Sequence, residues 1–279
     1  KSIKRKLKKL LKIKKLLKMK YNISLGTDPE IFIENETEIV SAEGLIPGTK
    51  YEPHPITNEG HCIQIDNIAF EFNIPPCTTK EEYVENINYV KDHLAVIAEA
   101  NGCKLSTKAS GEINPAYLQT ENAQTFGCEP DFNVWLQDIN PSPKTNTNLR
   151  CVGGHVHIGI DEQYRTDEIQ ENIVKMFDIM VTLPALLIDT DERRRELYGK
   201  AGSFRFKDFG VECRALSNFW IHSNELIEWV FEQTIKAVTV VLDGKADEYI
   251  KLYGEDTVTA INTNNKELAK QTIDKINTK

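Results

Sequence analysis

The chain has 279 residues, an ordinary share of apolar and charged side chains, and a formal net charge of −8. These values are typical of a soluble globular protein with one large domain or two small ones. No stretch approaches the roughly 20 apolar residues of a membrane span, so none is predicted. The six cysteines contain no CxxC pair. This pattern argues against a zinc ribbon or a disulfide scaffold and favours a reducing, cytoplasmic location.

The charge is distributed unevenly along the chain. The first 20 residues carry eleven Lys or Arg and no acidic residue, which leaves 23 basic against 42 acidic side chains in the remainder. The body is therefore a poor nucleic-acid binder by bulk charge. Residues 1–18 predict a basic amphipathic helix, which is compatible with an arm for a membrane surface or nucleic acid. We favour the other interpretation, an upstream extension outside the folded domain.

The first core elements surround two acidic motifs. Residues 21–35 predict a buried strand that is interrupted at an Asp-Pro pair, where the proline indicates an edge position or a bulge. Residues 44–60 form a loop rich in Gly and Pro, and residues 62–76 form another strand that two prolines end. We expect the catalytic domain to span residues 19–243 and a helical tail to span residues 244–279.

A helix follows the second strand. Thr79 is the expected N-cap, Glu82 completes a capping box, and Gly102 ends the helix. Its apolar stripe consists of Tyr83, Ile87, Val90, Leu94 and Ile97.

The second half of the chain alternates strands, loops and long helices. In chain order it predicts strand and turn at 104–113 and 126–135, a polar loop at 138–148, a strand at 150–160, a helix at 167–189, a basic loop and strand at 191–220, a helix from Ser223, and one or two helices in the tail. Long helices without a regular βαβ rhythm favour an α+β fold with a mainly antiparallel sheet.

Residues of the types that bind metals are scattered over the predicted strands. They are Asp28 and Glu30, Asp66 and Glu71, His155 and His157, and Glu212 beside Arg214. Three of these pairs are spaced by two, and a strand places residues i and i+2 on one face. Carboxylates and a histidine from separate strands can therefore surround a hard divalent cation, and arginines beside them indicate a phosphate-bearing substrate.

Each motif also has a plainer interpretation. Glu71 lies between Phe70 and Phe72, where a buried carboxylate needs a partner, yet alternation also permits an outward-facing side chain. His155 and His157 can be satisfied core histidines, or they can form the HxH of a zinc hydrolase. Because the other candidates are mostly carboxylates, Mg²⁺ or Mn²⁺ fits the set better than zinc.

The arginines fall into two groups. Arg205 and Arg214 lie in apolar strand contexts, where an unpaired guanidinium is costly, so we expect both at the site. The run at 193–195 is typical of a solvated face, and we do not expect all three arginines to be functional.

The order of the motifs resembles the phage-type amidoligase branch of the glutamine synthetase and glutamate–cysteine ligase superfamily of carboxylate–amine ligases. The shared motifs are GTDPE (26–30), PGTK (47–50), DNIAFEFN (66–73), GCEPDFNVW (127–135), GGHVHIG (153–159) and the block from Tyr198 to Trp220. The resemblance implies a glutamine synthetase-like catalytic fold, in which a curved, mainly antiparallel sheet carries the ligands on its concave face and helices pack on the convex face.

The resemblance also implies roles for individual residues. The metal ligands would be Asp28, Glu30, Asp66, Glu71, His155 and Glu212. Arg205 and Arg214 would contact the transferring phosphate, His157 would lie beside the nucleotide, and Lys50 and Lys200 are further phosphate candidates. We expect Arg205, Arg214 and Glu71 to take part in catalysis. The chain lacks a recognisable β-grasp domain, and the glutamate and ammonia contacts of glutamine synthetase have no counterpart here.

The resulting hypothesis is an ATP-dependent, Mg²⁺- or Mn²⁺-requiring ligase that forms an amide through an acyl phosphate. Its partners would be a small-molecule or peptide carboxylate and an amine donor. The alternatives are a zinc hydrolase that uses the HxH pair, an inactive binding protein on the same fold, and a nucleic-acid partner held by the leader. The sequence leaves the identity of the two substrates and the oligomeric state open, and an oligomer is compatible with it.

Overall fold

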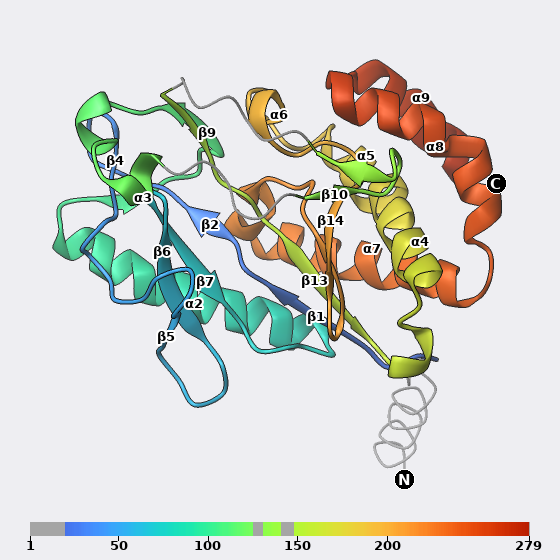
Figure 1. Cartoon of the computed structure of the whole chain (residues 1–279), viewed down its shortest axis with the longest axis horizontal. Helices are drawn as coiled ribbons and strands as arrows, with labels where there is room; N and C mark the ends of the chain where they lie inside the picture. Colours follow the sequence, from blue (N-terminus) through green and yellow to red (C-terminus); the bar gives the residue numbers. More distant parts are fainter. Residues whose placement is uncertain (1–19, 125–130, 141–147, 279) are drawn as a thin grey trace, which may run out of the picture.

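The computed structural model of the protein describes the chain apart from residues 1–19, 125–130, 141–147 and 279. The basic leader, part of the expected strand and turn at 126–135 and most of the loop at 138–148 therefore lie outside the described residues. The described chain combines helices with sheets whose strands all pair in antiparallel fashion, which confirms the α+β class (Figure 1).

The largest sheet has six strands. In spatial order they are β1 (Ile23–Thr27), β13 (Val156–Ile160), β15 (Gly210–Cys213), β14 (Ser203–Lys207), β10 (Phe132–Asn133) and β11 (Asp138–Ile139). The first strand of this sheet leads directly into the second sheet through Asp28 and Pro29.

The second sheet has four strands, in the order β2 (Glu30–Ile31), β7 (Ala69–Asn73), β6 (Cys62–Asp66) and β5 (His54–Pro55). Two smaller sheets contain β4 (Ile39–Val40), β3 (Ile33–Glu34) and β8 (Lys104–Leu105), and β12 (Leu149–Cys151) with β9 (Ser110–Glu112). The break at Asp28 and Pro29 therefore passes the chain from one sheet into the next.

The helix α2 (Lys80–Ala100) confirms the predicted capping box. The Thr79 hydroxyl accepts from the Glu82 amide at 3.2 Å, and the Glu82 carboxylate accepts from the Thr79 amide at 3.3 Å. Four members of the predicted apolar stripe are fully buried, whereas Ile97 is half-buried and Ala98 takes the inner position.

The remaining helices follow the predicted order. They are α3 (Glu121–Gln124), α4 (Asp167–Phe177), a π-helix (Asp178–Thr182), α5 (Leu183–Ala185), α6 (Arg194–Leu197), α7 (Asn224–Leu242), α8 (Ala246–Thr263) and α9 (Lys266–Asn277). The expected helix at 167–189 is thus helical only to residue 185 and contains one wider turn. Three short 3-10 segments are Pro115–Tyr117, Glu162–Tyr164 and Asn218–His222.

The main core lies between the six-stranded sheet and three helices. The helices α2 and α4 both pack on α7, and α4 also contacts β15. Figure 1 shows α2 and α7 behind the strands. From the sheet, Leu25, Val156, Ile158, Val211 and Cys213 contribute to this core and are at most 1% exposed. Burying these side chains is the main favourable contribution to the fold.

The two tail helices pack against the rest of the chain. Helix α8 contacts α4 and the π-helix, and α9 contacts α5 and α8. A Cβ at Gly254 of α8 would meet the Trp135 ring at 2.9 Å, so glycine allows this close approach. The boundary at residue 243 stays a prediction. None of the helices in the described part of the chain has the length and hydrophobicity of a membrane span.

Candidate active site

One row of the site crosses the six-stranded sheet. In the strand register, Arg205 lies opposite Glu212, Glu212 opposite His157, and His157 opposite Gly26. The neighbours of these residues along each strand, such as Val211, face the helical core. Because side chains alternate along a strand, the arginine, glutamate and histidine project from the face away from the helices.

A second row crosses the four-stranded sheet. Glu30 lies opposite Glu71, and Glu71 lies opposite Gln64. Asp28 occupies the break between β1 and β2, two residues after Gly26 of the first row and two before Glu30 of the second. The two rows therefore meet at Asp28.

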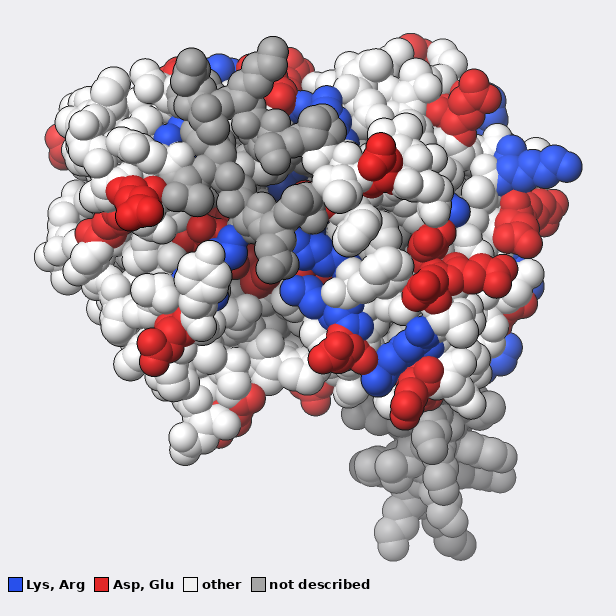
Figure 2. Space-filling view, viewed as in Figure 1, with Lys and Arg blue, Asp and Glu red and all other residues white. Residues whose placement is uncertain are grey.

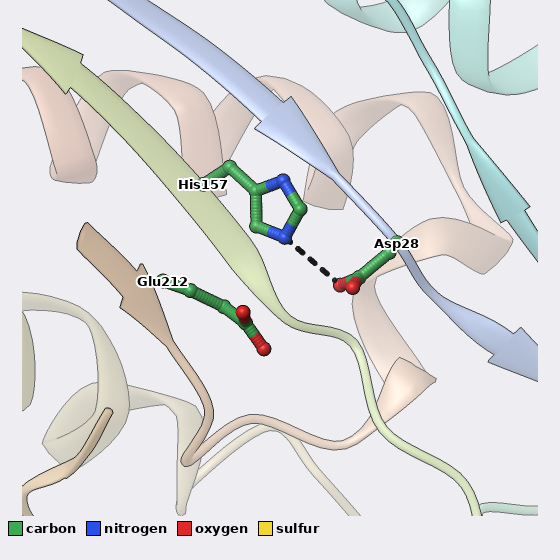
Figure 3. A group of neighbouring side chains, drawn as sticks. All are labelled: Asp28, His157 and Glu212. Carbon is green, nitrogen blue, oxygen red and sulfur yellow. Dashed lines mark ion pairs between the residues drawn. The ribbon is translucent and has the colours of Figure 1, made fainter. Parts of the chain in front are cut away.

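Asp28 is held by both histidines of the HxH pair. Its Oδ1 lies 3.2 Å from His155 Nδ1 and 3.2 Å from His157 Nε2. Figure 3 shows Asp28 and His157 facing each other, with the Glu212 carboxylate directed into the same space. Burial raises the pKa of Asp28, but His157 and His155 outweigh it and hold that pKa well below its usual range.

Glu212 is fully buried and surrounded by cations. Its Oε1 contacts the Arg214 guanidinium and lies 3.7 Å from Arg205, while its Oε2 lies 2.6 Å from Lys207 Nζ. Burial and Asp28 raise the pKa of Glu212, yet Arg214 and the histidines lower it to about 2. Glu212 is therefore a carboxylate with ample positive partners.

The carboxylates of the second row are in the opposite situation. Burial and the nearby Asp28, Asp66 and Glu30 all raise the pKa of Glu71 well above its usual range. Its Oε2 has no hydrogen-bond partner among the described residues. The pKa of Glu30 is also raised, by burial and Asp66, although the Gly153 amide donates to Glu30 Oε2 at 2.7 Å. His155 and Arg214 lower the pKa of Glu30 only in part, and acids that converge with a surplus of negative charge are a typical arrangement for a metal site.

A pair of arginines faces a third acid. Arg214 Nε lies 2.7 Å from Asp131 Oδ1, and an Arg205 terminal nitrogen lies 3.5 Å from the same oxygen. Asp131 and Glu212 thus hold both guanidinium groups from two sides. This arrangement fixes the directions in which the remaining N–H groups can donate to an anion.

A pocket lies beside these groups, with Glu71, Arg205 and Glu212 outside its lining. It is lined by Glu30, Phe32, Asp66, Asn67, Ile68, Ala69, Asp131, Arg150, Cys151, Val152, Gly153, His155, Arg194, Tyr198 and Arg214. Acidic, basic and apolar side chains thus line one pocket. Figure 2 shows Lys and Arg side chains gathered in the hollow between the two halves of this face.

The arginine run differs from the solvated face that its sequence suggests. Arg193 is exposed and pairs with Glu112, but Arg194 and Arg195 are 5% and 7% exposed. Arg194 donates to the carbonyl oxygens of Val152, Ala215 and Arg214. These backbone acceptors come from distant segments and satisfy a guanidinium that the sequence alone places in solvent.

The structure places the remaining predicted residues at different distances from the pocket. Lys50 Nζ lies 3.9 Å from Asp66 Oδ2, at the edge of the second row. Lys200 lies in the turn before β14 and does not line the pocket formed by the described residues. His155 lines the pocket, and His157 is half-buried beside Asp28.

Sequence reasoning missed several site residues, namely Asp131, Arg150, Arg194, Tyr198 and Lys207. Lys207 had a usable signal. It follows Arg205 by two residues in a strand, and the four residues 207–210 predict a hairpin that returns toward Glu212. The other residues reach the pocket through long-range packing that no local pattern reveals.

The donor atoms that converge at the site fit a divalent metal. Asp28, His157 and Glu212 offer ligand atoms within 4.8 Å of one another. The acids Glu30, Glu71 and Asp66 add oxygen donors beside them, and the orphaned Glu71 Oε2 needs a positive partner. A set dominated by carboxylate oxygens fits Mg²⁺ or Mn²⁺.

Comparison with known families gives a specific match. Residues 144–262 match the sequence model of the family described as "Phage phiEco32-like COOH.NH2 ligase-type 2". This segment is therefore similar to that ligase family. The matched segment contains His155, His157, Arg205, Glu212 and Arg214. Four carboxylates precede it, one in the break after β1 and the others on β2, β6 and β7, and the fold brings them to the same site. A comparison with curated proteins finds no match.

Proposed function

We propose that this protein is an ATP-dependent carboxylate–amine ligase that forms an amide through an acyl phosphate. The observation that carries the proposal is that a cluster of acids lies beside a cluster of buried arginines in one site. Uncompensated acids around Glu71 adjoin a set of buried guanidinium groups that includes Arg214. A divalent metal would need the acids as ligands, and the phosphate group in transfer would need the arginines, so the reaction requires both sets side by side.

The metal would be held by residues from both rows. Glu30, Glu71 and Asp66 would supply oxygen donors on the second row, and Asp28, His157 and Glu212 would do so on the first, with His155 beside them. When bound, a divalent cation would neutralise phosphate oxygens and orient the nucleotide.

The arginines would bind the anionic part of the reaction. Arg205 and Arg214 are fixed by Asp131 and Glu212, so their guanidinium groups need little reorganisation to donate to a phosphate oxygen. Lys50 at the edge of the second row would be a further contact for phosphate, and Glu71 would lie among the reacting groups.

The proposed reaction balances in two steps. An oxygen of the substrate carboxylate attacks the γ-phosphorus of ATP, and ADP leaves with the electrons of the broken P–O bond. The nitrogen of a neutral amine then attacks the acyl carbon, phosphate leaves, and the nitrogen loses one proton. The acid can be a small molecule or a peptide. The pocket holds both apolar side chains, such as Phe32 and Ile68, and charged ones, which suits an acid with an apolar stem.

The test is ATP-dependent trapping with hydroxylamine, which replaces the unknown amine and leaves only the acid to be found. The full chain is incubated with Mg²⁺, ATP, hydroxylamine and pools of carboxylic acids and peptides. Mass spectrometry then detects hydroxamates, and ADP and phosphate are measured in parallel. We expect one pool to yield a hydroxamate in proportion to ADP.

The variant Glu71→Gln removes a carboxylate from the proposed site. Glu85→Gln makes the same change on the exposed face of α2 and serves as the control. We expect Glu71→Gln to lower turnover roughly 100-fold or more and Glu85→Gln to leave it unchanged. Tightly bound zinc together with no binding of ATP by calorimetry would instead support a hydrolase that uses the HxH pair.

A further inference from the structure

Lys207 lies at the site but has no role in the proposed reaction. Its ammonium group lies 2.6 Å from Glu212 Oε2, while Arg214 contacts the other oxygen, Oε1. Both oxygens of Glu212 therefore face a cation supplied by the chain itself. A divalent cation that uses Oε2 as a ligand would meet the Lys207 ammonium at the same oxygen.

The two cations differ in how firmly they are held. Arg214 is 9% exposed in its side chain, and Asp131 holds its Nε at 2.7 Å. Lys207 is 32% exposed in its side chain, and Glu212 is the one acid that it contacts among the described ion pairs. A lysine side chain has a flexible four-carbon stem and reaches solvent easily, so Lys207 is the partner that can leave Glu212.

The strand also determines where a released ammonium can go. Lys207 follows Arg205 by two residues in β14, so both side chains project from the face that carries Glu212 and His157. An ammonium that moves away from Glu212 stays beside the Arg205 guanidinium. Two neighbouring cations on one strand face are suited to a phosphate group.

We propose that Lys207 is the exchangeable counter-cation of Glu212, displaced by a divalent metal and then bound to a phosphate of the nucleotide. The second half rests on the proposed function, because it requires ATP at this site. The first half requires only that Glu212 binds metal. Lys207 thereby couples metal occupancy to nucleotide binding, since each event favours the other through the same side chain.

The first measurement is Mn²⁺ affinity of the full chain without nucleotide, by electron paramagnetic resonance of free Mn²⁺. Lys207→Met removes the competing ammonium, so we expect Mn²⁺ to bind about tenfold more tightly than to the unmodified protein. Lys207→Arg keeps the charge and should bind Mn²⁺ no more tightly than the unmodified protein. Lys236→Met removes an exposed lysine from α7 and controls for net charge.

Unchanged Mn²⁺ affinity in Lys207→Met, an equal gain in Lys236→Met, or no Mn²⁺ binding by any form would each overturn the proposal. This readout does not depend on turnover, so it is separate from the hydroxamate test of the proposed function.

The second measurement is the affinity for ADP at saturating Mn²⁺, by calorimetry. We expect Lys207→Met to weaken ADP binding about tenfold and Lys207→Arg to restore most of it. Tighter Mn²⁺ binding with unchanged ADP affinity would overturn the phosphate role. Both effects together, in opposite directions, would establish the exchange.

Discussion

Two buried glutamates in this protein have opposite surroundings. Glu212, in the six-stranded sheet, contacts Lys207 and Arg214, and its pKa falls to about 2. Glu71, in the four-stranded sheet, faces other acids, and its pKa rises well above the usual range. The same residue type at similar burial therefore carries different information. A compensated acid stabilises the protein's own cations, whereas an uncompensated acid indicates a cation that must come from elsewhere.

The largest effect on stability is expected for Glu212→Gln. The neutral side chain leaves Lys207 without its carboxylate partner and Arg214 with Asp131 alone, so we expect the free energy of unfolding to fall by about 3 kcal/mol. Urea unfolding at pH 7.5 measures this loss. The double variant with Lys207→Met should recover part of it, because the cation that has lost its partner is removed. A Glu212→Gln protein as stable as the original would contradict the ion pairs described here.

The opposite sign is expected for Glu71→Gln. Because the folded pKa of Glu71 is raised, its contribution to stability is present below the unfolded value of 4.5 and is lost as pH rises. Glu71→Gln removes this loss, so without divalent metal at pH 7.5 we expect a gain of about 1 kcal/mol that shrinks toward pH 4. Saturating Mg²⁺ should raise the melting temperature of the original protein more than that of the variant. Equal responses to Mg²⁺ would argue against Glu71 as a ligand.

Asp178 is an intermediate case between Glu212 and Glu71. It is 1% exposed, and its Oδ2 accepts from Trp135 Nε1 at 2.7 Å and from the Gly202 amide at 2.6 Å. Burial raises its pKa from 3.8 to about 6, although these neutral donors lower it in part. Its stabilising contribution is therefore present below pH 3.8 and is lost as pH rises through about 6.

We expect the stability of Asp178→Asn relative to the original protein to increase by about 1 kcal/mol between pH 5 and pH 7.5. Asparagine keeps an oxygen that can accept from Trp135 and Gly202, so the change isolates the charge. Urea unfolding at both pH values measures it. A difference that is independent of pH would show that Asp178 titrates normally.

The smallest effect is expected at an exposed acid. Glu85 lies on the solvent face of α2, away from both rows. Glu85→Gln should change the free energy of unfolding by less than about 0.5 kcal/mol at any pH, and Mg²⁺ should stabilise it as it does the original protein. A larger shift would mean that net charge, and not the surroundings of each acid, controls the results above.

Local patterns were sufficient for the elements and for much of the first row. The capping box at Thr79 and the apolar stripe of α2 were confirmed. The spacing by two brought His155 and His157 to one carboxylate, Asp28. In these cases the signal depends on neighbours within one strand or one helix, which is what periodicity reports.

Long-range pairing lay beyond such patterns. The register that places Glu30 opposite Glu71 joins strands 41 residues apart, and no spacing rule determines it. The burial of Arg194 depends on backbone carbonyls of Val152 and Ala215, which have no sequence signature. Asp131 reaches Arg214 only because β10 pairs with β14. These contacts follow from how the sheets assemble.

We expect the acids around Glu71 and the triad of Asp28, His157 and Glu212 to bind divalent metal beside nucleotide phosphates. Anomalous diffraction at the manganese edge tests this expectation most directly, on crystals grown with Mn²⁺ and a non-hydrolysable ATP analogue. We expect manganese peaks at these carboxylates and a terminal phosphate facing Arg205 and Arg214. A single metal peak at the histidines alone, with no nucleotide in the pocket, would contradict the account.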